Sequence, residues 1–63
     1  MYTVKVVTMG TTERVAYTNT VLAGALMVGS SIVTSTKRIA RLYDSNTLVA
    51  SWATNGTLTW IVP

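Results

Sequence analysis

The feature that most constrains this chain is a change in the spacing of its apolar residues near position 20. Before it, residues 2–9 and 13–17 alternate apolar and polar side chains, which is typical of the two strands of a hairpin. From Val21 to Val33, apolar and small residues recur at steps of three and four, which predicts one broad helical face. Three β-type runs follow, at 38–43, 48–53 and 58–62. The predicted order is ββαβββ.

The predicted helix has to be held by packing rather than by its own propensity. Gly24 and Gly29 each cost about 1 kcal/mol relative to alanine inside a helix, although small residues let a helix lie close to a sheet. The residues at 18–20 can cap its start, and 34–36 are expected to end it. The fold class is therefore α+β, a single domain over residues 1–63 with one helix packed on a small antiparallel sheet.

A membrane-spanning reading of the same region is not favoured. Residues 15–35 carry no charge and lie between Arg14 and Lys37, a length that could span a bilayer. The continuous apolar segment covers only 21–28, however, and threonine, serine and asparagine surround it. The first ten residues alternate like a strand, so no leader peptide is expected there either. We do not expect a membrane to be the partner.

Composition removes most routes to catalysis. The chain of 63 residues has no histidine and no cysteine, and its two acidic residues are Glu13 and Asp44. Its hydroxyl groups therefore lack the usual activating base, and paired carboxylates or metal-ligand clusters cannot be assembled. The glycines match no phosphate-binding spacing. We predict no catalytic residues, no metal ligands and no cofactor-binding residues.

Two turns predict which side chains share a face in the C-terminal half. A two-residue type I′ turn at Asn55-Gly56 would pair Trp52 with Thr59. A turn at Ser45-Asn46 would pair Tyr43 with Leu48 and Ile39 with Trp52. One face then collects Ile39, Arg41, Tyr43, Leu48, Ala50, Trp52, Thr59 and Ile61. The other collects Arg38, Ala40, Leu42, Val49, Ser51, Ala53, Leu58, Trp60 and Val62.

On this register both faces are apolar and the two tryptophans point in opposite directions. One helix can cover only one face, so the other is expected to bind a partner, either a second copy or another protein. The predicted contact residues are Ile39, Arg41, Tyr43 and Trp52 if the helix covers the Trp60 face, and Leu42, Val49 and Trp60 otherwise. If a β-bulge shifts the strand register, or if the N-terminal hairpin covers the second face, no exposed apolar face is expected.

Nucleic-acid binding is the alternative function. The net charge is +3, and cations at Lys37, Arg38 and Arg41 accompany the aromatic residues of the same strands. Aromatic side chains on a sheet with a basic rim bind single strands by stacking. Arg38 and Arg41 are expected on opposite faces, however, so they cannot form one phosphate clamp.

The overall pattern resembles small bacteriophage-encoded accessory or host-takeover proteins. It rests on the strand that starts at Met1-Tyr2-Thr3-Val4, the helix after Tyr17-Thr18, and the strand Leu48-Val49-Ala50-Ser51-Trp52. The resemblance implies a non-enzymatic homodimer that inhibits or modulates a host protein in the bacterial cytoplasm. Acidic mimicry of DNA, which many such inhibitors use, does not fit a basic chain.

Overall fold

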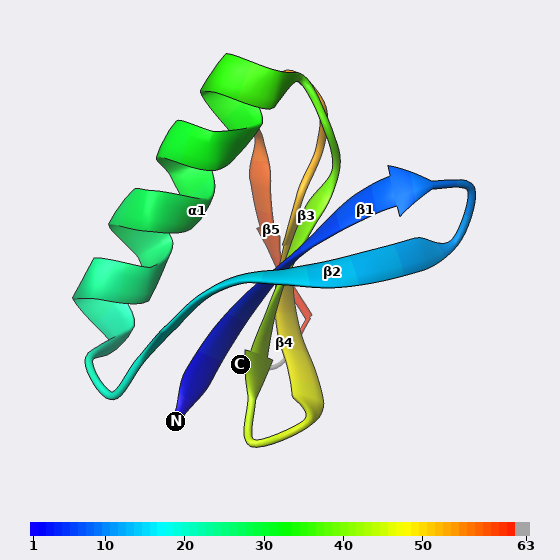
Figure 1. The fold of residues 1–63 in the computed structure, drawn as a ribbon. Helices are drawn as coiled ribbons and strands as arrows, with labels where there is room; N and C mark the ends of the chain where they lie inside the picture. Colours follow the sequence, from blue (N-terminus) through cyan, green and yellow to red (C-terminus); the bar gives the residue numbers. More distant parts are fainter. Residues whose placement is uncertain (62–63) are drawn as a thin grey trace.

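A computed structural model of the protein describes residues 1–61 and confirms the α+β fold. One helix packs on a five-stranded antiparallel sheet in the predicted order (Figure 1). The elements are β1 (Tyr2–Met9), β2 (Thr12–Asn19), α1 (Leu22–Thr36), β3 (Ala40–Asp44), β4 (Thr47–Trp52) and β5 (Leu58–Trp60). The last predicted strand reached Val62, which lies outside the described residues.

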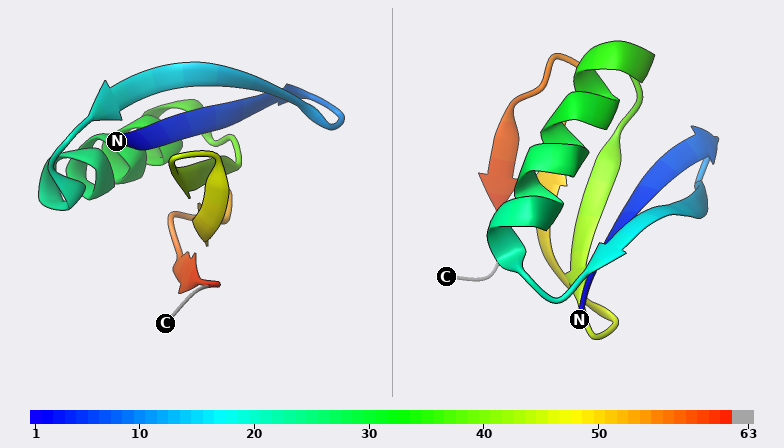
Figure 2. Two further views of the ribbon diagram at one scale, coloured as in Figure 1. Left: turned by 90° about the horizontal axis from the view of Figure 1, so that it is seen from below. Right: turned by 60° about the vertical axis from the view of Figure 1, so that its left-hand side comes forward.

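The strand order in the sheet is β2-β1-β3-β4-β5, so β1 pairs on one side with β2 and on the other with β3. The chain leaves β2, passes through α1, and returns as β3 on the far side of β1. The sheet is strongly twisted and α1 lies along one face of it (Figure 2). Within the described chain, the opposite face has no helix over it. We call it the open face.

The helix begins without the side-chain cap that the sequence predicted. Its N-cap residue is Val21, which cannot cap. Asn19 instead accepts a hydrogen bond from the Val21 N–H at 3.0 Å, one step before the helix, while its amide donates to the Tyr17 hydroxyl at 2.9 Å. At the other end the helix continues through 34–36 and stops at Lys37, whose left-handed φ of 60° closes the last turn.

The core lies between α1 and the sheet, and Trp52 is its largest side chain, at 1% exposure. The buried residues are Val4, Val6, Ala25, Val33, Ala40, Leu42, Ala50 and Trp52. Gly29 on α1 faces the indole directly, because a Cβ there would lie 2.6 Å from Trp52 Cζ2 and closer still to Cη2. The predicted close approach of the helix is therefore confirmed, and glycine is what permits it.

Of the two predicted C-terminal turns, the one at Ser45-Asn46 is confirmed and the two-residue turn at Asn55-Gly56 is wrong. Ser45 and Asn46 form the two-residue turn, with φ of 49° and 77°, as type I′ requires at both central positions. The other loop is longer: Ala53 donates to the Thr57 carbonyl and Gly56 donates back to the Ala53 carbonyl, both at 2.9 Å. Gly56 has a φ of 93°. This three-residue loop shifts the β4–β5 register by one residue, so Trp52 lies opposite Leu58 rather than Thr59.

A second irregularity corrects the β3–β4 register. Tyr43 pairs with Leu48 as predicted, but Leu42 then pairs with Ala50, which leaves Val49 as an extra residue in β4. Ala40, rather than Ile39, consequently lies opposite Trp52. Together the two shifts place Trp52 and Trp60 on the same, helix-covered side of the sheet. The prediction of opposed tryptophans on two apolar faces is wrong.

Candidate functional site

The open face is the side of the sheet that the helix leaves uncovered in the described chain (Figure 2). Alternation along β3 fixes it, because Ala40 and Leu42 are buried under α1 while Arg41 and Tyr43 point the other way. Ile39 joins the same row, since the Val7 N–H donates to its carbonyl and extends the β1–β3 ladder. The residues that register places on this face are Thr3, Lys5, Val7, Glu13, Val15, Thr18, Ile39, Arg41, Tyr43, Leu48, Ser51 and Thr59.

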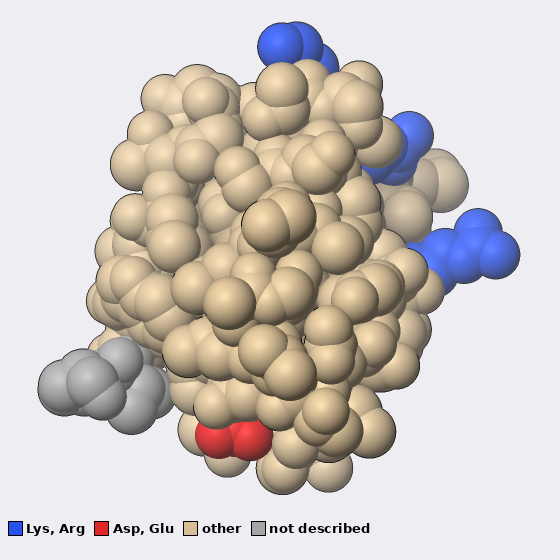
Figure 3. Space-filling model, turned by 90° about the vertical axis from the view of Figure 1, so that its left-hand side faces the viewer, with Lys and Arg blue, Asp and Glu red and all other residues tan. Residues whose placement is uncertain are grey.

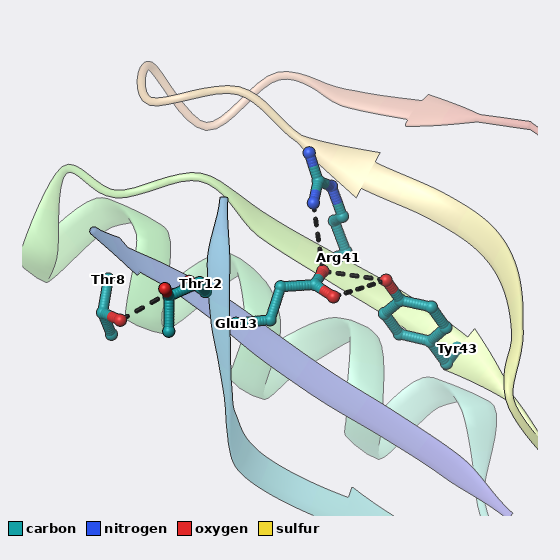
Figure 4. A network of polar contacts seen from close by, with 5 residues as sticks. All are labelled: Thr8, Thr12, Glu13, Arg41 and Tyr43. Carbon is teal, nitrogen blue, oxygen red and sulfur yellow. Dashed lines mark hydrogen bonds and ion pairs between the residues drawn. The ribbon is translucent and has the colours of Figure 1, made fainter. Parts of the chain in front are cut away.

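A carboxylate lies at the centre of this face. Glu13 extends from β2 across β1 and accepts a hydrogen bond from Arg41 Nη1 at 3.1 Å (Figure 4). The Tyr43 hydroxyl also contacts both carboxylate oxygens, at 2.9 and 2.8 Å. The side chains of Arg41 and Glu13 are 35% and 20% exposed, so the group is half-buried rather than fully solvated. Its bonds connect β2 to β3 over the intervening strand.

Lys5 completes the group from β1. Its Nζ lies 4.6 Å from the centroid of the Tyr43 ring, which is within cation–π distance. The open face therefore carries two cations around one carboxylate and one phenol. This polar centre differs from the apolar second face that the sequence predicted.

The pKa values of Glu13 and Tyr43 are shifted in opposite directions. Burial by itself would raise the pKa of Glu13, but the hydrogen bonds from Tyr43 and Arg41, with the charges of Arg41 and Lys5, bring it below its ordinary value. Burial, followed by the hydrogen bond to Glu13 and its negative charge, raises the pKa of Tyr43. Both shifts favour a charged carboxylate beside a neutral phenol.

The structure places the predicted contact residues on both sides of the sheet. Ile39, Arg41 and Tyr43 lie together on the open face, as predicted for a helix on the Trp60 side. Trp52 does not join them, because the corrected register buries it beneath α1. In the alternative set, Leu42 is fully buried and Val49 packs against the core. Trp60 is 48% exposed, but it lies on the helix side of β5.

The predicted nucleic-acid contacts have other roles in the described structure. Lys37 closes the helix, Arg41 is paired with Glu13, and Arg38 Nη1 donates to the Thr8 carbonyl at 2.7 Å. Glu13 and Lys5 are the site residues that sequence reasoning missed. Glu13 is 28 positions from Arg41 in the sequence. The two residues come together only because β2 and β3 pair with opposite sides of β1.

The helix side of the molecule differs from the open face in its charge. Seen from that side, the surface is almost free of charged groups, with cations at its upper and right-hand rim and one acid at its lower edge (Figure 3). This follows from the sequence, in which residues 15–36 and 45–61 contain no charged side chain. Exposed apolar residues on or beside α1 and β5 include Met27, Trp60 and Ile61.

Two classes of site find no support in the part of the chain that the structure covers. Within residues 1–61, histidine, cysteine, aspartate and glutamate nowhere gather in a group of three that could hold a metal ion. The one helix among these residues, with 15 residues, is not long enough to cross a bilayer.

No protein-family model, no curated protein sequence and no solved structure matches the chain.

Proposed function

We propose that this chain is a small, non-enzymatic protein-binding module and that the open face is its contact surface. The observation that carries the proposal is the joint fixation of Arg41 and Tyr43 by the Glu13 carboxylate. Arginine and tyrosine are enriched among the residues that dominate binding energy at interfaces. Side chains that are already ordered lose less conformational entropy when a partner binds.

The residues around this pair have the composition of an interface. Val15 and Ile39 are exposed aliphatic side chains, at 57% and 37% exposure. Four of the seven remaining positions on this face are small hydroxyl residues, Thr3, Thr18, Ser51 and Thr59, which present little that would need strong desolvation. Protein interfaces combine an aromatic and arginine centre with few further charges, as this face does.

The same geometry disfavours a nucleic acid on this face. The Glu13 carboxylate would repel phosphate groups, and it neutralises Arg41. The Tyr43 ring already holds the Lys5 ammonium, and neither tryptophan lies on this side of the sheet. A stacking platform needs bare aromatic rings beside unpaired cations. Protein is therefore the favoured partner class, and single-strand binding is the alternative outcome of the test.

The finer form of the proposal is that the chain is phage-encoded and inhibits or modulates a host protein in the cytoplasm of a bacterium. This form is supported only by the resemblance of the sequence pattern. Its mechanism would be occlusion of the host protein's surface, since the open face offers contacts and no reactive group.

The test compares two charge-introducing variants that leave the core intact. Ile39→Asp places a charge on the open face, and Met27→Asp places one on an exposed position of α1. Proteins retained from a bacterial lysate by the wild-type chain are identified and purified, and their dissociation constants are measured. We expect Ile39→Asp to weaken binding by more than about tenfold, as loss of an interface residue of moderate importance does, and Met27→Asp to leave it unchanged.

Equal binding by wild type and Ile39→Asp would show that the open face is not the contact surface. An oligonucleotide in the same assay distinguishes the alternative. Binding that falls steeply as salt rises, and that Ile39→Asp leaves intact, would favour nucleic acid over protein.

A further inference from the structure

The two edges of the sheet are protected to different extents against pairing with another chain. The β2 edge carries the charged residues Glu13 and Arg14, and Ala16 forms a bulge, since Val4 pairs with Tyr17 but Lys5 pairs with Val15. Charges and bulges are the usual means by which an edge strand avoids pairing with another strand. The β5 edge has neither, because no charged residue occurs in 45–61 and the β4–β5 register is continuous.

The backbone of β5 presents free hydrogen-bonding groups at this edge. The Ala53 N–H donates to the Thr57 carbonyl, and the Ile61 N–H donates to the Val49 carbonyl, both at 2.9 Å. Residues 57 and 61 therefore direct their polar groups toward β4, and so does Thr59 between them. Because these directions alternate along a strand, the N–H and C=O of Leu58 and Trp60 point away from the sheet.

The side chains at the same two positions are apolar and lie on one side. Leu58 is opposite Trp52 and Trp60 is opposite Ala50, so both are on the helix side of the sheet. The helix packs on β1 to β4. It leaves β5, the edge strand of the sheet, largely uncovered (Figure 2). Leu58 packs against the core, whereas nearly half of Trp60 remains exposed.

We propose that a second copy of this chain pairs antiparallel with β5, around Thr59, so that two five-stranded sheets join into one. Pairing about Thr59 places Leu58 opposite Trp60 of the second copy, and Trp60 opposite its Leu58. Both are pairs of outward-facing residues, and each such pair can exchange two backbone hydrogen bonds. The outward groups of β5 are therefore complementary to those of a second β5 at this register.

At the same register, the apolar side chains of the two copies also pack against one another. The two-fold axis of such a pair runs through the sheet from face to face, so Leu58 and Trp60 of both copies stay on the helix side. Each indole then packs on a leucine directly across and lies within diagonal reach of the other indole. The strand has no charge, so pairing brings no like charges together and buries no unpaired ion. The open faces of the two copies remain free and lie side by side.

Self-association is tested by sedimentation over a range of concentrations, with two matched edge variants. Trp60→Lys and Val15→Lys each replace an exposed apolar residue by the same charge, one on β5 and the other on β2. We expect a wild-type dimer at micromolar concentration, a Val15→Lys dimer of equal affinity, and an association of Trp60→Lys weaker by more than about tenfold, as loss of an interfacial tryptophan produces. Circular dichroism checks that each variant is folded.

A measurement on the wild type keeps the test valid even if a variant misfolds. The amide protons of Leu58 and Trp60 should exchange quickly at low concentration and become protected as concentration rises, because only the second copy supplies their acceptors. A monomer at millimolar concentration overturns the proposal. So does a dimer that Val15→Lys disrupts and Trp60→Lys does not, or one in which these two amides stay unprotected. Loss of the dimer in Trp60→Lys with partner binding retained would leave the proposed function of the open face untouched.

Discussion

Gly29 lies against the indole of Trp52, and this contact permits a calculation for the variant Gly29→Ala. The added methyl carbon would lie 2.6 Å from Cζ2 and 2.8 Å from Cζ3 of the indole. Non-bonded carbon atoms are in contact at about 3.5–4.0 Å, so the helix or the ring has to move by about 1 Å. Trp52 is buried on all sides, which leaves little room for that movement.

The expected loss of stability combines two opposing effects. Overpacking of a core costs about 1–3 kcal/mol. Removing a glycine from the interior of a helix returns about 1 kcal/mol. Because several ring atoms are crowded at once, we expect a net loss of about 1–2 kcal/mol in the free energy of unfolding. For a domain of this size, each kcal/mol lowers the melting temperature by roughly 4–8 °C.

The assay is urea unfolding followed by circular dichroism, carried out as a double-mutant cycle with Trp52→Phe. The crowding atoms belong to the outer ring of the indole, which a phenylalanine does not reach. In the Trp52→Phe background, Gly29→Ala should therefore be neutral, or stabilising by up to about 1 kcal/mol. Ser30→Ala, an exposed neighbour on α1, should have the same effect in both backgrounds. Equal destabilisation by Gly29→Ala in both backgrounds would refute the steric argument.

Two further predictions concern the open face and the β4–β5 loop. The free energy of unfolding should decrease below pH 4.5, as the pH falls through the lowered pKa of Glu13, since the unfolded chain binds that proton more readily. It should decrease again above pH 10.0, as the pH rises through the raised pKa of Tyr43. Denaturant titrations across pH check both limbs; an alkaline decrease that is unchanged in Tyr43→Phe would contradict the assignment. Gly56→Ala should lower the free energy of unfolding by about 1–2 kcal/mol, because the backbone φ is positive at Gly56. The exposed neighbour Thr54→Ala is the control, and equal stability of the two variants would count against this account.

The sequence was sufficient to predict the elements and the Tyr43–Leu48 pair, but not the rest of the β3–β4 and β4–β5 registers. Alternation within one strand correctly placed Ile39, Arg41 and Tyr43 on one face, because that inference needs no partner strand. Trp52 was assigned to the same face through the β3–β4 register, and Trp60 to the opposite face through the β4–β5 register; both registers differ in the structure. Val49 adds a residue to β4, and the loop before β5 has three residues instead of two. A shift of one residue moves a side chain to the other face.

The turn residues themselves explain part of this failure. Asn-Gly is the commonest type I′ pair, yet here Gly56 alone takes a positive φ, and Asn55 Oδ1 accepts a hydrogen bond from the Thr57 N–H at 3.0 Å. Ser45 and Asn46 adopt the tighter turn although serine is a poor residue for it. Glu13 could not be assigned to the site from the sequence, because its partners become neighbours only once β3 pairs with β1. The turn types and the composition of the site were therefore set by strand pairing in the folded chain, and not by the local turn preferences of these residues.

The place of β1 within the sheet bears on how the chain assembles during synthesis. β1 precedes every other strand, and it is the strand on which both β2 and β3 form. Each later strand then adds to an edge that already exists, first β3, then β4, then β5. A nascent chain can therefore pair its strands in the order in which they leave the ribosome, without waiting for the C-terminal segment. The slow step in that order is the β1–β3 pairing, which joins residues 34 to 42 positions apart in the chain.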